Sequence, residues 1–438
     1  MPQFVKAGVR ELYESKFISY EDALGKLKSG DVLSMGSYGN EPVGLLRRLH
    51  TVVDRGVEDL TVWMGFPAEN YPFIEKDELG DRIKINSIFY GGPLRAKQYT
   101  KRVTFAPNNL HSAFQVMLNN KKPNVFVAAV TPMDRYGYVA LSLSQQTELE
   151  MLDACDLIIL EVNPRIPYTS GTVRIPVSKV DYFIQADYPI STSPIYPVTP
   201  EQDAIATNVA SLIHDGDTIQ LGIGGLPDAV AEKLMDHNDL GIYTEMLGTA
   251  MGKLMWAGVV NNSRKNFYRN RTIAAFCWGS QDLYDYVNDN PMIEIMPCNY
   301  VNDPFNIAKN DNMVSVNTAL QIDLTGQVCS EKIGTLQYSG TGGASDFAYG
   351  AYHAKNGRGI IAIASTAKNG TISRIQPTLS LGAAVSISRN IVDTVVTEFG
   401  IARIRDCTIR QRVDRLIAIA HPDFRAELRK EADKLMMW

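Results

Sequence analysis

Residues 23–49, ALGKLKSGDVLSMGSYGNEPVGLLRRL, follow the same pattern as residues 210–234, ASLIHDGDTIQLGIGGLPDAVAEKL. Each stretch reads as the end of a helix, a Gly-Asp turn, an apolar strand, a glycine loop, a proline and a new helix. The matched positions are Gly30-Asp31 with Gly216-Asp217, Gly36 with Gly222 and Gly39 with Gly225, while Pro42 and Pro227 fall one residue out of step. Such an ordered match indicates an internal duplication.

Three further pairs of segments extend the duplication. They are residues 59–63 with 239–243, 133–142 with 322–331, and Asp156–Glu161 with Asp393–Glu398. The last pair consists of four mostly apolar residues between acidic ends, which predicts a buried strand in each half.

The two halves predict an α/β protein with two similar domains. Short apolar runs such as VFVAAV, residues 125–130, alternate with longer amphipathic stretches, as in a largely parallel sheet flanked by helices. A linker rich in Pro, Ser and Thr at residues 188–202 divides the chain into domains 1–195 and 196–438. Ligands of such sheets bind beyond the carboxyl ends of the strands, so we expect the active site in the cleft between the domains.

Composition excludes several classes of protein. The 438 residues carry 43 basic and 48 acidic side chains, a net charge of −5 that does not favour nucleic acid or an anionic membrane as a partner. No run reaches the roughly 18 apolar residues of a membrane helix, and the N-terminus lacks a signal pattern, so we expect a cytoplasmic protein. The five scattered cysteines and six dispersed histidines predict neither disulfides nor a metal site.

A glycine loop, Leu221–Pro227, follows an apolar strand at residues 218–221 and opens a helix predicted at residues 228–235. Backbone N–H groups at such a position suit an anion. A tight turn without any ligand is the alternative. A dinucleotide site is disfavoured because Pro227 stands where that motif needs a glycine.

Glu245 ends a short predicted strand, GIYTEM, at residues 241–246. Counting from the matched Asp-Leu pairs, its counterpart in the first half is Gly65, so this carboxylate belongs to one half only. Glu161 and Glu398 occur in both halves, as a shared structural element would. Glu245 is therefore the candidate reactive acid, with an ordinary salt-bridged or solvated glutamate as the alternative.

A second glycine cluster, residues 338–347 (YSGTGGASDF), also leads from a strand into a helix, with Asp346 in the first helical turn. Its backbone donors again suit an anion, and a flexible turn is the alternative.

Together these segments resemble the acetyl-CoA hydrolase/transferase family, closest to 4-hydroxybutyrate CoA-transferases and butyryl-CoA:acetate enzymes. The motifs, in family order, are GDTIQLGIGGLPDAV, GIYTEM, NTALQIDLTGQV, IGTLQYSGTGGASDFAYGA, VVTEFGIA and IAHPDF, with GDVLSMG and LEVNPRIP in the first half. The resemblance implies two α/β domains, Glu245 as a covalent nucleophile, acyl-CoA and a short-chain carboxylate as substrates, and a homodimer or homotetramer. It implies CoA contacts from Gly222, Ile223, Gly224, Gly225, Leu226, Leu320, Gly343 and Lys368.

The implied chemistry is transfer of CoA through a glutamyl-CoA thioester. Backbone donors at Ile223-Gly224 and Gly342-Gly343, with the Asn317 amide, would stabilise the oxyanions. CoA is a substrate, and no permanently bound cofactor is expected. A thioesterase and a non-catalytic CoA-binding protein are the alternatives.

Two segments depart from the family pattern, Leu247-Gly248-Thr249 after Glu245 and Gly343-Ala344-Ser345, so the identity of the acyl group stays open. The basic run from Arg264 to Arg271 is interpreted as a solvated face, with a site for the CoA phosphates as the alternative.

Overall fold

The computed structural model describes residues 7–438 except 172, 195, 196 and 223. The chain forms two compact units. Unit 1 runs to Ser193 and also includes Ala275–Tyr300, while unit 2 consists of Pro194–Ala274 and Val301–Trp438. The sequence division kept 196–438 together, whereas the structure packs residues 275–300 with unit 1. The domain boundary at residue 195 stays a prediction.

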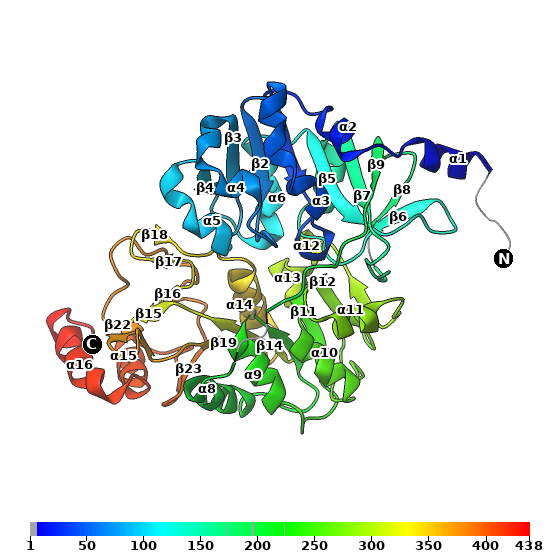
Figure 1. Cartoon of the computed structure of the whole chain (residues 1–438). Helices are drawn as coiled ribbons and strands as arrows, with labels where there is room; N and C mark the ends of the chain where they lie inside the picture. The colour runs from blue at the N-terminus through cyan, green and yellow to red at the C-terminus, as the bar shows by residue number, and fades with distance from the viewer. Residues whose placement is uncertain (1–6, 172, 195–196, 223) are drawn as a thin grey trace. The chain divides into compact units, whose positions relative to one another are not determined.

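Unit 1 is built around a parallel sheet with the strand order β4-β3-β2-β1-β5-β7-β9 (Figure 1). The strands are β1 (Val32–Met35), β2 (Leu60–Met64), β3 (Ile83–Ser87), β4 (Val103–Phe105), β5 (Val125–Val130), β7 (Leu157–Val162) and β9 (Tyr182–Gln185). The apolar run predicted at 125–130 is β5, and all six of its residues are buried. Burial on both faces explains why β5 is a continuous apolar run rather than an alternating one.

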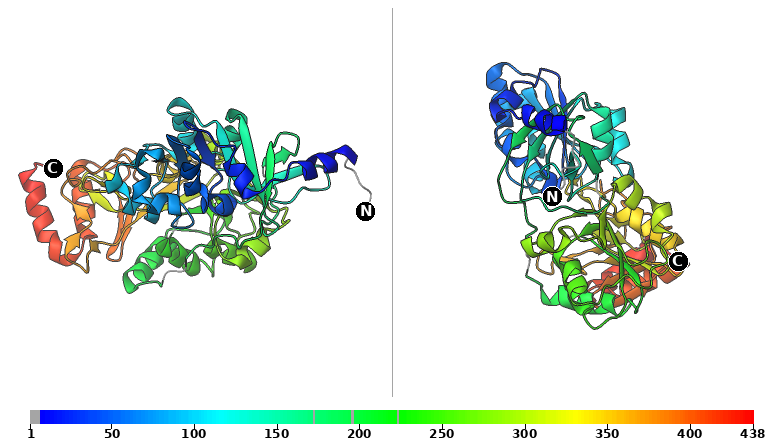
Figure 2. Two further views of the ribbon diagram at one scale, coloured as in Figure 1. Left: turned by 45° about the horizontal axis from the view of Figure 1, so that its top comes forward. Right: turned by 90° about the vertical axis from the view of Figure 1, so that its right-hand side faces the viewer.

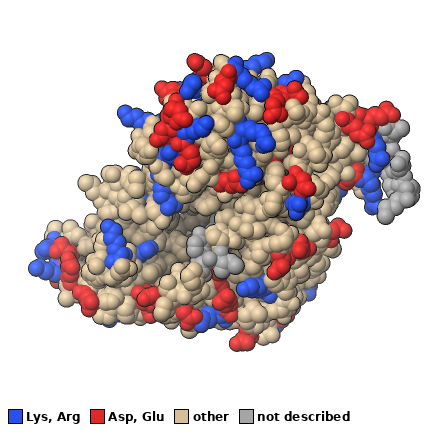
Figure 3. Space-filling view, in the orientation of Figure 1, with Lys and Arg blue, Asp and Glu red and all other residues tan. Residues whose placement is uncertain are grey.

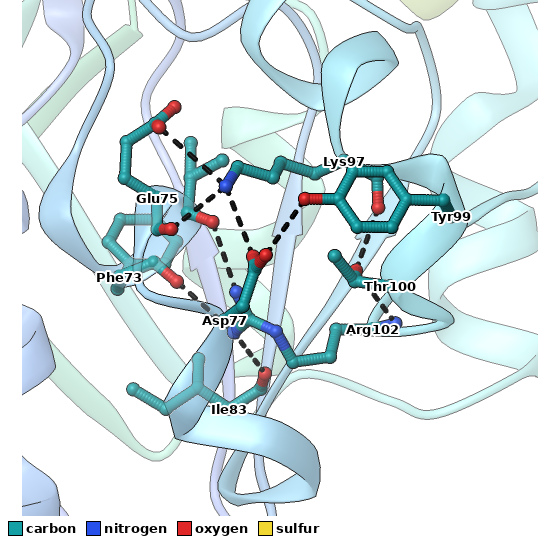
Figure 4. A network of polar contacts seen from close by, with 9 residues as sticks. Phe73, Glu75, Asp77, Ile83, Lys97, Tyr99, Thr100 and Arg102 are labelled. Atoms are coloured by element: carbon teal, nitrogen blue, oxygen red, sulfur yellow. Dashed lines mark hydrogen bonds and ion pairs between the residues drawn. The ribbon is translucent and has the colours of Figure 1, made fainter.

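A network of polar contacts joins the segments that flank β3 and β4 in unit 1 (Figure 4). Asp77 accepts hydrogen bonds from Lys97 Nζ, at 3.0 Å, and from the Tyr99 hydroxyl, at 2.8 Å. The buried Arg102 guanidinium donates to the backbone carbonyls of Phe73 and Ile83, each at 3.3 Å. These contacts join Asp77 to Lys97 and Tyr99, and the Arg102 guanidinium to two backbone carbonyls.

Unit 2 contributes six neighbouring strands to the second sheet, in the order β11-β10-β14-β19-β23-β24. Its strands are β10 (Thr218–Leu221), β11 (Gly241–Leu247), β14 (Met313–Thr318), β19 (Arg358–Ala362), β23 (Thr394–Thr397) and β24 (Gly400–Arg403). Neighbours pair in parallel except β23 and β24, which are antiparallel. This sheet and its helices confirm the predicted α/β class.

Helices of unit 2 surround this sheet. α8 (Pro200–Ala210) packs on α9 (Gly225–Lys233), which contacts α10 (Thr249–Trp256), and α14 (Ala344–His353) packs on β14 and β19. At the C-terminal end, α15 (Ile409–Ala418) packs against α16 (Pro422–Lys434), as Figure 2 shows. β12 (Thr272–Cys277) carries the chain from unit 2 into unit 1.

The duplication is visible in the backbone. The order β2-β1-β5 in unit 1 corresponds to β11-β10-β14 in unit 2. Gly30 and Gly216, which precede the two equivalent strands, have φ angles of 84° and 85°. Asp59 and Asp239 also match, at 54° and 56°, although such angles are uncommon outside glycine. The same turns therefore enter the same strands in both units.

One of the matched pairs of segments is wrong. β7, which ends with Glu161 and Val162, lies beside β5, and the strand in the corresponding place of unit 2 is β19. β23, which precedes Glu398, corresponds instead to β9. Glu161 and Glu398 are therefore not equivalent. The sequence match was misleading because many buried parallel strands are apolar runs between acidic ends.

Acidic and basic side chains are interspersed on the face of the molecule in Figure 3. Within the residues that the structure describes, no helix combines the length and apolar character needed to cross a membrane.

Candidate active site

Strand pairing fixes the place of Glu245 in the duplicated design. Gly241 of β11 pairs with Thr218 of β10, just as Thr61 of β2 pairs with Val32 of β1. Four residues further along the chain from Gly241 and Thr61 lie Glu245 and Gly65. The register confirms that the acid has a glycine as its counterpart. β11 continues past Glu245 to Leu247, so the acid lies within the strand rather than at its end.

The Glu245 carboxyl group is enclosed by polar groups of unit 2. Asn302 Nδ2 donates a 2.7 Å hydrogen bond to Glu245 Oε2, and the Gly343 backbone N–H also donates to this carboxylate. Burial raises the pKa of Glu245 from 4.5 to about 7. The Asn302 amide opposes that shift, the Asp346 charge adds to it, and the Gly343 hydrogen bond opposes it. A carboxylate that ionises near neutral pH beside two fixed amide donors is suited to covalent chemistry.

Glycine is required at position 343 by the close approach of the site. A methyl group on Gly343 would lie 1.9 Å from Glu245 Oε2 and 2.2 Å from Asn302 Nδ2. Its φ of −95° is open to any residue, so the constraint is steric rather than conformational. Gly343 immediately precedes α14, whose N-terminus therefore faces the acid.

The first glycine loop lines a cavity of about 350 Å³. Gly224, Gly225 and Leu226 form one part of its wall, and Leu320 and Ser339 form another. α9 begins at Gly225, three residues earlier than predicted, which brings its N-terminal backbone groups into the loop. The structure thus brings together four of the residues implied for CoA binding.

A second cavity, of about 580 Å³, adjoins the first. Gln202, Ala364 and Arg374 line both cavities. Lys368 lines the second, and so does His421. Because they share these residues, the two cavities form one groove in unit 2, the CoA groove, that runs from the glycine loop to Lys368.

Among the residues that the structure describes, several others that the family resemblance implied for CoA binding or oxyanion stabilisation do not line these cavities. The Gly222 N–H donates to the Val316 carbonyl at 2.9 Å, so it completes the sheet. The Asn317 amide is buried and exchanges two 3.2 Å hydrogen bonds with the Gln220 amide. Ile223 lies outside the described residues. Gly342 has a left-handed φ of 56° in the bend before Gly343.

The basic run is not a solvated face throughout. Lys265 is 3% exposed, and its Nζ donates to the carbonyls of Ile242, at 2.7 Å, and Arg271, at 2.6 Å. Arg264 forms a 2.7 Å ion pair with Asp239. Lys265 therefore supports the strand that carries Glu245.

Sequence reasoning missed Asn302 and Arg374. Asn302 follows the one-turn helix α12 (Cys298–Val301) and is fully buried, but no motif or apolar period marks it. The acid and its amide donor are 57 positions apart in the chain, so only the fold brings them together.

Comparisons with known proteins show which family of proteins the chain resembles. Profiles of the acetyl-CoA hydrolase/transferase family match residues 1–193 (N-terminal domain) and 279–432 (C-terminal domain). The chain is 41% identical to a succinyl-CoA:cyclohexane-1-carboxylate CoA transferase of Geobacter metallireducens, over 98% of both chains. It is 39% identical to a 4-hydroxybutyrate coenzyme A transferase of Clostridium kluyveri, over 97% of this chain and 99% of that one. The crystal structure of RipA from Yersinia pestis superimposes with a TM-score of 0.93, at 38% identity, covering 98% of this chain and all of the other.

Proposed function

The chain belongs to the acetyl-CoA hydrolase/transferase family, and from this we propose that it transfers CoA from a short-chain acyl-CoA to acetate or another short carboxylate. 4-Hydroxybutyryl-CoA and butyryl-CoA are the proposed donors. The observation that carries the proposal is the Glu245 carboxylate held between Asn302 and Gly343, with its pKa raised to about 7.

The proposed reaction is a chain of acyl substitutions at Glu245. A Glu245 carboxylate oxygen attacks the thioester carbonyl carbon. The C–S bond breaks, CoA departs as its thiolate, and a mixed anhydride of Glu245 and the acyl group remains. The thiolate then attacks the glutamyl carbonyl, the donor acid departs, and a glutamyl-CoA thioester remains. An acceptor carboxylate then attacks the glutamyl-CoA thioester, which releases CoA thiolate and forms a second mixed anhydride. The thiolate attacks the acceptor's carbonyl in this anhydride, so the acceptor leaves as its CoA thioester and the Glu245 carboxylate is restored. No oxidant, reductant or net proton transfer is required.

Amide donors at the acid support these steps. Attack on the glutamyl carbonyl places negative charge on a Glu245 oxygen, beside the Asn302 and Gly343 donors that already contact this carboxyl group. Fixed donors cost no reorganisation as charge develops, and loss of one such donor typically lowers the rate by about 10²–10³-fold.

This CoA groove is the proposed binding site for CoA. Gly224, Gly225, Leu226 and Leu320 would contact the part of CoA nearest the thiol, and Lys368 the phosphates. Arg374 adds a cation where the two cavities meet. Binding energy from this remote part of CoA is then available for the reacting centre. We propose that CoA acts only as a substrate, with no resident cofactor, and that the enzyme is a cytoplasmic homo-oligomer.

A CoA-release assay tests the proposal. Acyl-CoA donors, including butyryl-, 4-hydroxybutyryl- and succinyl-CoA, are incubated with enzyme in the presence and absence of acetate, and free CoA and acetyl-CoA are quantified. We expect acetyl-CoA with ping-pong kinetics and little free CoA. Free CoA released without acetate at the same rate would instead identify a thioesterase. CoA binding without either product would identify a binding protein.

A further inference from the structure

A buried acid outside the proposed chemistry lies near the second glycine cluster. Glu331 is 7% exposed and stands between β16 (Val328–Cys329) and β17 (Lys332–Ile333). Withdrawing a carboxylate from water is costly unless hydrogen bonds replace the lost hydration. The partners of Glu331 therefore show what this residue holds in place.

Three side chains donate to the Glu331 carboxylate. Oε1 accepts from Thr341 Oγ1 at 2.9 Å and from Ser386 Oγ at 2.8 Å, and Oε2 accepts from Gln337 Nε2 at 3.2 Å. All three donors are neutral. Two of them, Gln337 and Thr341, belong to the segment that leads into Gly343.

The Glu331 backbone binds the same segment. Its carbonyl oxygen accepts from the N–H groups of Tyr338, at 2.8 Å, and Ser339, at 3.0 Å. The segment 337–341 is thus attached to Glu331 at both ends. Backbone hydrogen bonds hold Tyr338 and Ser339, and the Thr341 hydroxyl holds the last residue of the segment. Gly342 follows with a left-handed φ of 56°, and the next N–H, that of Gly343, contacts Glu245.

We infer that Glu331 is a positioning residue that aims the Gly343 N–H at the Glu245 carboxylate. The anchor at Thr341 lies two residues before this donor, so a rotation of the loop there would be carried directly to the Gly343 N–H. The expected effect on the rate of CoA transfer rests on the proposed function, whereas the expected effect on the pKa of Glu245 does not.

The test removes one hydroxyl with little change of shape. Thr341→Val deletes the donor to Glu331, and Thr397→Val is the matched control, because the buried Thr397 hydroxyl donates to the Ile419 carbonyl at 2.6 Å, outside the loop. Two quantities are compared: kcat for CoA transfer, and the pKa of Glu245 from its ¹³C side-chain carboxyl NMR signal, assigned with Glu245→Gln. Misplacement of about 1 Å can cost 10²-fold in rate.

For Thr341→Val we expect a fall in kcat of about 10- to 10²-fold with little change in KM, and a higher pKa of Glu245, because a hydrogen bond to its ionised form is weakened. Thr397→Val should alter neither quantity, even where its thermal midpoint falls. Glu331→Gln should act like Thr341→Val, and the double variant should be no worse than either single one.

An unchanged pKa of Glu245 in both Thr341→Val and Glu331→Gln would overturn the inference, as would equal effects of Thr341→Val and Thr397→Val. Absence of CoA transfer in the unaltered protein would refute the proposed function alone, since the NMR measurement still reports whether Glu331 positions the donor.

Discussion

Asn302 Nδ2 lies 2.7 Å from Glu245 Oε2 and donates a hydrogen bond to the ionised form of that acid. Asn302→Ala removes this donor from a fully buried position. We expect the pKa of Glu245 to rise above about 7 and kcat to fall by about 10²-fold or more. Because the nucleophile must be deprotonated, the acid limb of the kcat/KM profile should move to higher pH.

Asp346→Asn provides the opposite perturbation. The Asp346 charge raises the pKa of Glu245, so its removal should move the acid limb to lower pH. A shift of both variants in the same direction would show that the profile reports general disruption rather than Glu245.

Gly343→Ala should abolish transfer because the new methyl group would lie 1.9 Å from Glu245 Oε2. The acid or the loop must move, and we expect kcat to fall by more than about 10²-fold. Gly359→Ala is the control, since a methyl group there meets nothing closer than 3.8 Å. Near-normal turnover of Gly343→Ala would contradict the proposed geometry.

The duplicated α/β fold was predictable because strand and turn signals are local and occur twice. It was also predictable that the acid at position 245 occurs in one half of the duplication only. Counting from Asp59 and Asp239 places Gly65 opposite Glu245, and the strand register confirms this match. The false pairing of Glu161 with Glu398 arose because buried strands look alike in sequence. Asn302 could not be found from sequence, because a buried amide becomes recognisable only through the partner that folding places beside it.

Lys368→Met tests the proposed phosphate end of the groove. Loss of one cation from the cavity of about 580 Å³ should raise KM for acyl-CoA by about 10-fold, equivalent to about 1.4 kcal/mol, and leave kcat nearly unchanged. Lys355→Met is the control, because Lys355 is an exposed residue paired with Asp311. Equal KM values in the two variants would remove Lys368 from the CoA site.

Glu245 should reduce stability at alkaline pH. Its folded pKa of about 7 lies above the ordinary value of 4.5, so the folded state binds the proton more tightly, and stability falls as pH rises through this window. Glu245→Gln should therefore be more stable than the unaltered protein at pH 8, by at most roughly 3 kcal/mol. The advantage should shrink as pH falls toward 4.5. Urea unfolding at both pH values measures it, and an advantage independent of pH would contradict the assignment.

Trapping the covalent intermediate tests the central claim most directly. The enzyme is mixed with butyryl-CoA, treated with hydroxylamine or borohydride, digested and examined by mass spectrometry, with Glu245→Ala in parallel. We predict a hydroxamate or a reduced side chain at Glu245, formed only after acyl-CoA is added, and neither adduct nor transfer in Glu245→Ala. An adduct at another residue, or transfer that persists in Glu245→Ala, would contradict Glu245 as the nucleophile.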